Sequence, residues 1–145
     1  MKQLKKITLA LLFIISVTQL QAKDVPVTFQ ELPNKAQTFL KTYFPSLQTS
    51  YVIQDKGFFS TEYEVTLEDG TQLEFDENGD WKGVDGQHRS IPTAFIPAKI
   101  IKYVKAKFPN MTISKIEKDS RKYDIELNGD LDLEFNLKGD FLRMD

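Results

Sequence analysis

The sequence predicts an α+β fold: two tandem repeats, each a helix followed by about four antiparallel strands, forming one continuous sheet with both helices on one face. Three observations lead to this prediction. A residue pattern occurs twice, apolar residues recur with helical periodicity in each copy, and apolar and polar residues alternate after each helix. An antiparallel sheet with one covered and one wet face accommodates all three.

The duplicated pattern divides the chain into two copies. The first helical stretch, LPNKAQTFLKTYFP, ends at Pro45, and the second, IPAKIIKYVKAKFP, ends at Pro109, 64 residues later. The segments that follow begin at Tyr63 and Tyr123, only 60 residues apart, so the first copy has four extra residues between helix and strands. We expect one domain over residues 23–145, with repeats at about 28–85 and 92–145.

Each predicted helix has one apolar face and a proline at either end. The apolar positions follow the helical period and are Ala36, Phe39, Leu40, Tyr43 and Phe44 in the first copy, and Ile100, Ile101, Val104 and Phe108 in the second. Pro33 and Pro97 suit a first helical turn. Pro45 and Pro109 end the helices, because the residue before a proline disfavours helical geometry.

The predicted strands alternate between apolar and acidic residues. Tight turns are expected at Asp69-Gly70 and Asn128-Gly129, and earlier strands near Thr49–Gln54 and Thr112–Glu117. The acidic residues that should project from the uncovered face are Glu62, Glu64, Glu68, Glu74, Asp124, Glu126, Asp132 and Glu134. Lysines cluster on the helices instead, so we expect a single-sign face that receives a basic partner or a cation, or is simply solvated.

Residues 1–22 have the pattern of a secretory signal peptide. Three lysines precede an apolar run, Ile7 to Val17, that is short for a membrane span, and the segment ends at the small residue Ala22. We expect cleavage there, export to the periplasm or the extracellular space, and no membrane insertion afterwards; the alternative is a retained anchor. The remaining chain has 16 Lys and Arg against 21 Asp and Glu, a formal charge of −5, which disfavours a nucleic-acid partner. With no cysteine, the fold depends on its apolar core.

A set of residues in the first copy points to a known family. The residues are Leu32-Pro33, Phe39, Phe44-Pro45, Tyr63, Val65, Leu67, Asp69-Gly70, Glu74-Phe75-Asp76, Gly79 and Trp81. They resemble those of the exported bacterial proteins called PepSY-like, or beta-lactamase-inhibitor-like. The second copy matches less closely, with Phe141 in place of the tryptophan. The resemblance implies a periplasmic protein whose concave sheet grips a partner, and it brings no catalytic residues.

Residues for nucleophilic or zinc chemistry are scarce. His88 is the only histidine, and it lies with Ser90 in the polar linker between the copies, where we expect it to be exposed. One histidine without cysteine does not provide the usual zinc ligands. Carboxylates are abundant, but no pair stands apart from the others, so a small hydrolase is the least favoured function.

The stretch EFDENGDW resembles the first half of a calcium loop. Asp76, Asn78 and Asp80 alternate as calcium ligands do, but the twelfth position, Gln87, is neutral where such a loop needs an acid. The second copy, EFNLKGDF, retains the glycine and the following aspartate, but Asn136 and Lys138 replace the other two candidate ligands. We therefore predict a hairpin turn, with these three residues as weak metal candidates.

The four extra residues of the first copy suggest a second contact. In DKGFFSTEY, strand parity places Phe59 with Tyr63 in the core and Phe58 with Glu62 on the exposed side. An exposed aromatic residue at a hairpin tip is a plausible interface anchor; the alternative is that both rings are packed.

Taken together, the residues favour an exported, non-enzymatic binding module without a cofactor that inhibits or modulates an envelope protein or peptide of basic character. The expected binding residues are Phe58, Glu62, Glu64, Glu74, Glu126 and Glu134. The alternative function is a calcium- or cation-binding module.

Overall fold

The structure of the protein is a computed structural model that describes residues 23–145. The predicted signal peptide and its cleavage site lie outside the described residues. The helices are the 3-10 turn η1 (Phe29–Glu31), α1 (Asn34–Tyr43) and α2 (Ala98–Lys107). The strands are β1 (Lys23–Val27), β2 (Thr49–Lys56), β3 (Thr61–Leu67), β4 (Gln72–Asp76), β5 (Trp81–Asp85), β6 (Ile113–Lys118), β7 (Lys122–Leu127), β8 (Leu131–Asn136) and β9 (Phe141–Met144).

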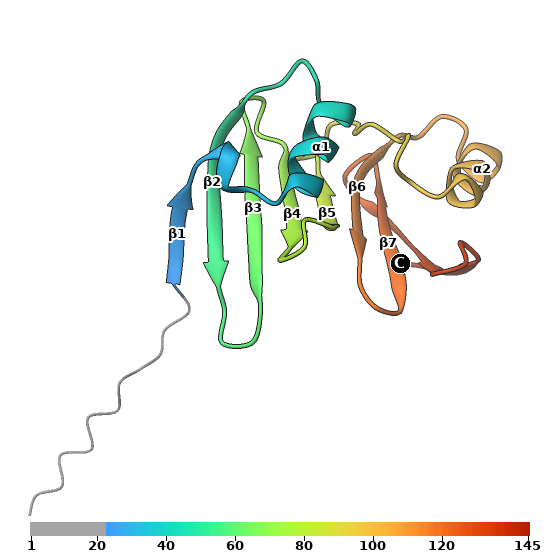
Figure 1. Ribbon diagram of the computed structural model, residues 1–145. Coiled ribbons are helices and arrows are strands. Elements are labelled where there is room, and N and C mark those ends of the chain that lie inside the picture. Colours follow the sequence, from blue (N-terminus) through green and yellow to red (C-terminus); the bar gives the residue numbers. More distant parts are fainter. Residues whose placement is uncertain (1–22) are drawn as a thin grey trace, which may run out of the picture.

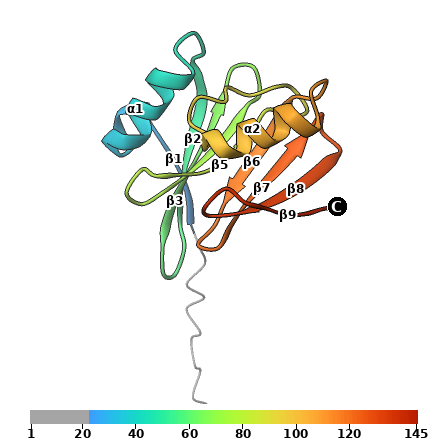
Figure 2. The same ribbon diagram turned by 90° about the vertical axis from the view of Figure 1, so that its right-hand side faces the viewer.

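All nine strands of the described chain form one antiparallel sheet in the order β1 to β9. The two halves meet where β5 pairs with β6, with Val84 opposite Ile116. Both helices lie on the same side of the sheet (Figure 1), and α2 crosses the strands of the second half (Figure 2). The predicted α+β class, continuous sheet and common helix face are confirmed. Each half has a helix and then four strands, whereas a duplication as their origin stays a prediction.

β1 is an additional strand that the sequence analysis did not predict. It pairs with β2 and forms one edge of the sheet, with Val27 opposite Val52. Pro26 lies within it, and proline is compatible with an edge strand because an edge leaves some N–H groups without a strand partner. This strand has only five residues and contains a proline, so it shows little of the alternation between apolar and polar residues that predicted the other strands.

The core lies between the helices and the sheet. Ala36, Leu40 and Phe44 of the first helical segment are buried, as are Ile100 and Val104 of α2. Each helix begins directly after a proline, which is its N-cap rather than part of its first turn, and ends one residue before a phenylalanine that is its C-cap. Pro45 and Pro109 follow these caps, so the helices end where the sequence predicted. The apolar strand residues on the helix side that are almost completely buried include Val65, Leu73, Phe75, Val84, Ile116, Ile125, Leu133 and Phe135.

Two equivalent turns pack against the start of the two helices. Gly79, between β4 and β5, and Gly139, between β8 and β9, both have φ of +84°, a conformation that favours glycine. A β-carbon on Gly79 would lie 2.8 Å from Cβ of Pro33, just ahead of α1. One on Gly139 would lie 3.1 Å from Cβ of Lys99 in α2. The glycines therefore permit both the turn and the close approach of the helix.

No helix within residues 23–145 has the length and hydropathy required to cross a membrane.

Candidate functional site

The face of the sheet opposite the helices, here called the open face, carries the acidic residues that the sequence pattern assigned to it. One row of paired residues crosses it from β3 to β8: Glu64, Glu74, Gly83, Glu117, Asp124 and Glu134. Most of their neighbours along the strands are apolar residues buried on the helix side, such as Val65, Leu73 and Ile125. The alternation therefore placed the acidic side chains correctly.

The prediction of a single-sign face was wrong. Lys82, Lys115, Lys122 and Arg143 reach the acidic side chains of the open face and form ion pairs with them. Lys82 lies at a bulge in the β4–β5 pairing, where strand parity is interrupted. The lysines of the helices are therefore only part of the basic charge, and the open face is acidic with basic residues between the acids.

Lys82 links two glutamates of the first half. Its ammonium forms a hydrogen bond with Glu62 and lies 3.5 Å from Oε1 of Glu74. The hydrogen bond from Lys82 lowers the pKa of Glu62. Burial, followed by a hydrogen bond with Glu62, raises the pKa of Glu74. The single lysine thus stabilises the negative charge of Glu62 and compensates the charge of Glu74 only weakly.

Glu134 has the least exposed side chain among the ion-paired residues of the second half. Its side chain is 15% exposed, and its Oε1 accepts hydrogen bonds from Lys122 at 2.7 Å and Arg143 at 2.9 Å. These two donors, Lys122 first, lower the pKa of Glu134. Lys122 also lies 3.0 Å from Asp124. Glu134 is therefore a structural carboxylate with its charge already neutralised.

Two shallow hollows lie side by side on the open face. The first, of about 220 Å³, has Gly83 in its lining together with Tyr51, Glu64, Glu74, Asp85, Lys115 and Glu117. The second, of about 270 Å³, is lined by Lys115, Glu117, Asp124, Glu126, Asp132, Glu134 and Asp145. Lys115 borders both. In each lining the carboxylates outnumber the single lysine, so each hollow favours a cationic group.

Glu64 and Glu126 are the predicted site residues with carboxylates that form no ion pair within residues 23–145. Glu64 is exposed at the first hollow. Glu126 lines the second hollow and accepts a hydrogen bond of 3.0 Å from the hydroxyl of Ser114. The predicted set therefore divides: Glu62, Glu74 and Glu134 are held by basic neighbours, whereas Glu64 and Glu126 keep their charge available.

The sequence analysis missed Tyr51 and Gly83. Tyr51 is 52% exposed and lines the first hollow, where its ring lies on the same face as the carboxylates. Gly83 pairs with Glu74 and Glu117, and the absence of a side chain there leaves room in the row of acids. A glycine inside a strand pattern is a usable signal, since it weakens a strand unless close approach or space is needed.

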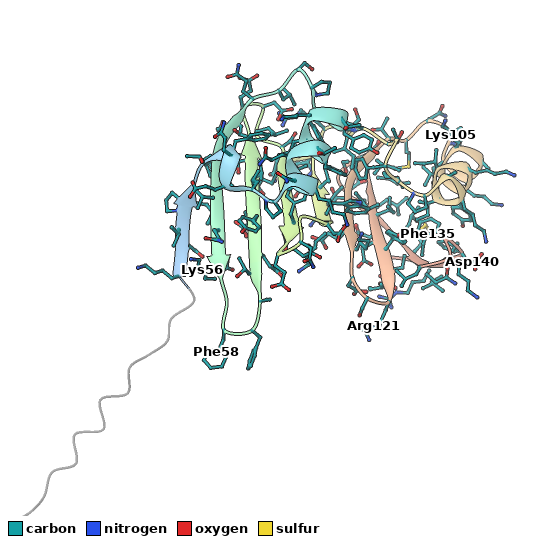
Figure 3. The ribbon with its side chains drawn as sticks, viewed as in Figure 1. Lys56, Phe58, Lys105, Arg121, Phe135 and Asp140 are labelled. Atoms are coloured by element: carbon teal, nitrogen blue, oxygen red, sulfur yellow. The ribbon has the colours of Figure 1, made fainter. Side chains whose placement is uncertain are left out.

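Phe58 is 70% exposed at the tip of the β2–β3 hairpin, as predicted, and lies at its far end in Figure 3. The prediction for Phe59 was wrong: it is 94% exposed and packs on Phe58, with ring centroids 4.7 Å apart. Strand pairing ends at Lys56 and Thr61, so Phe59 lies in the turn, where the alternation of the strand no longer applies.

The Asp76–Asp80 segment forms the hairpin turn between β4 and β5. Oδ1 of Asp76 accepts hydrogen bonds from the backbone N–H groups of Asn78 and Asp80, each at 2.9 Å. Asp80 is paired with Lys35 of α1 at 2.8 Å. Within residues 23–145 no group of three or more His, Cys, Asp and Glu side chains is arranged to hold a metal ion.

The corresponding turn of the second half has the same contacts with a neutral residue. Oδ1 of Asn136 accepts from the N–H groups of Lys138 and Asp140, and Asp140 pairs with Lys99 of α2. An asparagine performs the turn function of Asp76 there. The hydrogen bonds that close the turn therefore do not require a carboxylate.

His88 and Ser90 are exposed in the linker between β5 and α2. The part of the chain that the structure describes contains no hydrogen bond between their side chains. A nucleophile and its base need such a contact, so the linker offers no preformed catalytic pair.

Comparison with known proteins agrees with this architecture. The family model described as "Putative beta-lactamase-inhibitor-like, PepSY-like" matches residues 61–143. A search of the curated proteins gives no match.

Two solved structures from Bacteroides are similar over most of the chain. A putative calcium-regulated periplasmic protein of Bacteroides thetaiotaomicron has 35% identity and a TM-score of 0.81, covering 84% of this chain and 96% of its own. A putative periplasmic protein from the DUF2874 family of Bacteroides vulgatus has 32% identity and a TM-score of 0.81, covering 85% and 97%. With a matching family model and relatives of this identity and coverage, the chain belongs to the PepSY-like, beta-lactamase-inhibitor-like family.

Proposed function

We propose that the protein is an exported, non-enzymatic binding module, and that its open face holds a basic segment of a protein or peptide in the periplasm. The observation that carries the proposal is the pair of free carboxylates, Glu64 and Glu126, beside two hollows whose linings are net acidic. The periplasmic descriptions of the solved relatives support the location. If the basic segment belongs to an enzyme, its capture on the open face inhibits or modulates that enzyme.

The first hollow has the groups that bind a lysine or arginine side chain. Glu64 supplies a negative charge and Tyr51 an aromatic ring, and Gly83 leaves space in the row of acids between Glu74 and Glu117. Basic residues on the same face screen the other acids, so an incoming cation is attracted mainly to the carboxylates that have no ion pair.

Charge reversal of the free carboxylates tests the proposal. The wild-type protein and the variant Glu64→Lys with Glu126→Lys are used as bait in an envelope extract at low salt, and captured proteins are identified by mass spectrometry. We expect the variant to lose basic partners that the wild type captures, with a decrease in affinity of about tenfold or more for two contacts at a desolvated face.

The matched control carries the same change of charge away from the open face. Glu77→Lys with Asp130→Lys alters two exposed acids in turns, and it should capture the same partners as the wild type. If all three proteins captured the same set, the open face would not be the binding surface.

Filling the first hollow gives an independent test. A β-carbon on Gly83 would meet no atom closer than 3.6 Å, so Gly83→Leu can be accommodated without a backbone clash. We expect this variant to keep the melting temperature within a few degrees of the wild type, since the new side chain lies at an open surface, about the change given by a surface substitution. It should lose the partner; unchanged capture would assign binding to another surface.

A second candidate function is binding of calcium, because one solved relative is described as a putative calcium-regulated periplasmic protein. Asp76 and Asp80 are the candidate ligands in this chain, and Lys35 competes for Asp80. Equilibrium dialysis with calcium tests this function directly. Binding that is strengthened by Lys35→Gln and abolished by Asp80→Asn would support it, and no retained calcium would exclude it at this turn.

A further inference from the structure

The tip of the β2–β3 hairpin exposes two aromatic rings that contact each other and are not part of the core. Phe58 and Phe59 are 70% and 94% exposed, whereas the buried phenylalanines of the strands, such as Phe75, are fully covered. The hairpin extends beyond the neighbouring β4–β5 turn (Figure 1). Exposure of adjacent large apolar side chains at a projecting tip is unfavourable in water and marks an interaction site.

Basic side chains lie at the same end of the sheet as this tip. Lys23 and Lys56 are paired across β1 and β2 in the row nearest the tip, and both are exposed. Arg121, in the β6–β7 turn, lies at the same end of the molecule (Figure 3) and is also exposed. None of the three forms an ion pair with residues 23–145.

The carboxylates nearest to Lys23 and Lys56 lie behind them. Asp24, Asp55 and Glu62 form the next row of the sheet, one residue further from the tip. Glu62 is already bound by Lys82. The outermost residues of the β2–β3 tip and of the adjoining end of β1 are therefore aromatic and cationic, whereas in the β6–β7 turn Arg121 is accompanied by Asp119.

We propose that the β2–β3 tip docks on the surface of a phospholipid bilayer that carries anionic headgroups. The rings of Phe58 and Phe59 enter the boundary between headgroups and acyl chains, and the ammonium groups of Lys23 and Lys56 remain at the level of the lipid phosphates. Long lysine side chains suit this role because their stems lie along apolar material while the charge stays in water.

The contact is peripheral and does not insert the chain across the membrane. It leaves the strands directed toward the bilayer and the open face at the side, accessible from the periplasm (Figure 1). A protein partner for the tip is less well supported, because the rings form a small projecting knob, and among the described pockets none includes them in its lining.

Co-sedimentation with lipid vesicles tests the proposal. The exported protein, with its N-terminus determined by mass spectrometry, is mixed with vesicles of phosphatidylglycerol and phosphatidylcholine, and separately with vesicles of phosphatidylcholine alone. We expect binding to the mixed vesicles that weakens with salt, because anionic headgroups attract Lys23 and Lys56.

Three variants in the same background separate the contributions. Phe58→Ser with Phe59→Ser should reduce vesicle affinity by about tenfold or more, since the variant lacks the two rings that enter the bilayer. Lys23→Glu with Lys56→Glu should abolish the preference for anionic lipid. Leu142→Ser is the matched control: it removes an apolar side chain that is 52% exposed on β9, and binding should not change.

We expect each variant to keep its fold, because all of the altered side chains are exposed. Circular dichroism checks this. The proposal fails if the wild type does not sediment with the mixed vesicles, or if the phenylalanine variant binds them as well as the wild type. It is also overturned if that variant keeps vesicle binding and instead loses a protein captured from the envelope extract, because the tip would then be a protein interface.

Discussion

The aromatic clusters of the two halves use matching positions but are enclosed to different degrees. Phe39 of α1 contacts five other rings, those of Tyr43, Phe44, Phe75, Trp81 and Phe95. Tyr103, at the corresponding position of α2, contacts the rings of Phe135 and Phe141 and no other ring within residues 23–145. The first cluster is therefore a centre of packing, and the second is a smaller group at the side of the molecule.

The difference comes from the place of each half in the sheet. Trp81 lies on β5, which has β6 as its neighbour, and Phe95 of the linker packs on it at 5.2 Å. Phe141 lies on β9, the last strand of the sheet, and remains 38% exposed. Similar sequence patterns thus give a buried centre or an exposed edge, depending on which element comes next.

Truncation of the two matching helix residues should show this difference most strongly. Phe39→Ala should lower the free energy of unfolding by about 3 to 4 kcal/mol, because it leaves a cavity among several rings. Tyr103→Ala should cost about 2 kcal/mol, since part of its environment is already close to solvent. Urea denaturation monitored by circular dichroism measures both. Equal losses would mean that the edge cluster contributes as much as the central one.

Substitution of the turn glycine should also cost more stability in the first half than in the second, by a smaller margin than for the helix residues. Gly79→Ala combines an unfavourable positive φ with contacts of 2.8 Å to Pro33 and 2.9 Å to the backbone nitrogen of Ala36, for a cost of about 3 kcal/mol. Gly139→Ala meets only the side chain of Lys99, which can move, so about 1 to 2 kcal/mol is expected.

The melting temperatures of these two glycine variants provide the measurement. Asn128 is a useful reference, because it adopts a positive φ of 50° without being glycine. Asn128→Gly relieves that conformation but removes the side-chain oxygen that accepts the Thr112 N–H at 2.9 Å, so we expect a loss of about 1 kcal/mol. A larger loss for Gly139→Ala than for Gly79→Ala would contradict the assigned helix contacts.

The smallest expected effect separates the two glutamates at matching positions, Glu74 and Glu134. The lowered pKa of Glu134 stabilises the fold at pH values above the ordinary glutamate value of 4.5, and this contribution is lost as the pH falls through the lowered pKa. The raised pKa of Glu74 acts in the opposite sense: in the window just above 4.5, stability increases as the pH falls.

We therefore expect Glu134→Gln to destabilise the protein at neutral pH and Glu74→Gln to be neutral or slightly stabilising. Thermal unfolding followed from neutral to acidic pH measures both. The deficit of Glu134→Gln should disappear in acid, where the wild-type carboxylate is itself protonated. A deficit independent of pH would indicate that packing, rather than charge, is what Glu134 contributes.

Much of the fold was predictable because its signals are local. Prolines delimit the helices, alternation defines the strands, and the turn at Asn128-Gly129 has positive φ at both residues, as such a dipeptide favours. The strand β1 was missed because it is short, contains Pro26 and lies at an edge, where pairing rather than pattern creates the strand.

The candidate site was predictable only in outline. Parity placed Glu64 and Glu126 on the open face, but it could not show which acids would be neutralised, since that depends on the reach of lysines from neighbouring strands. It failed for Phe59, where the strand had already ended. Local pattern gives the face of a residue within a strand, and only the pairing of strands gives its partners.

The strands occur in the sheet in the same order as in the chain. Each strand from β2 onward forms against its immediate predecessor, so no strand has to be inserted between two that are already paired. Local connections of this kind favour rapid folding, because little chain entropy is lost before each contact forms. Strands can thus be added one at a time to a growing edge, from β1 onward, with β9 completing the sheet.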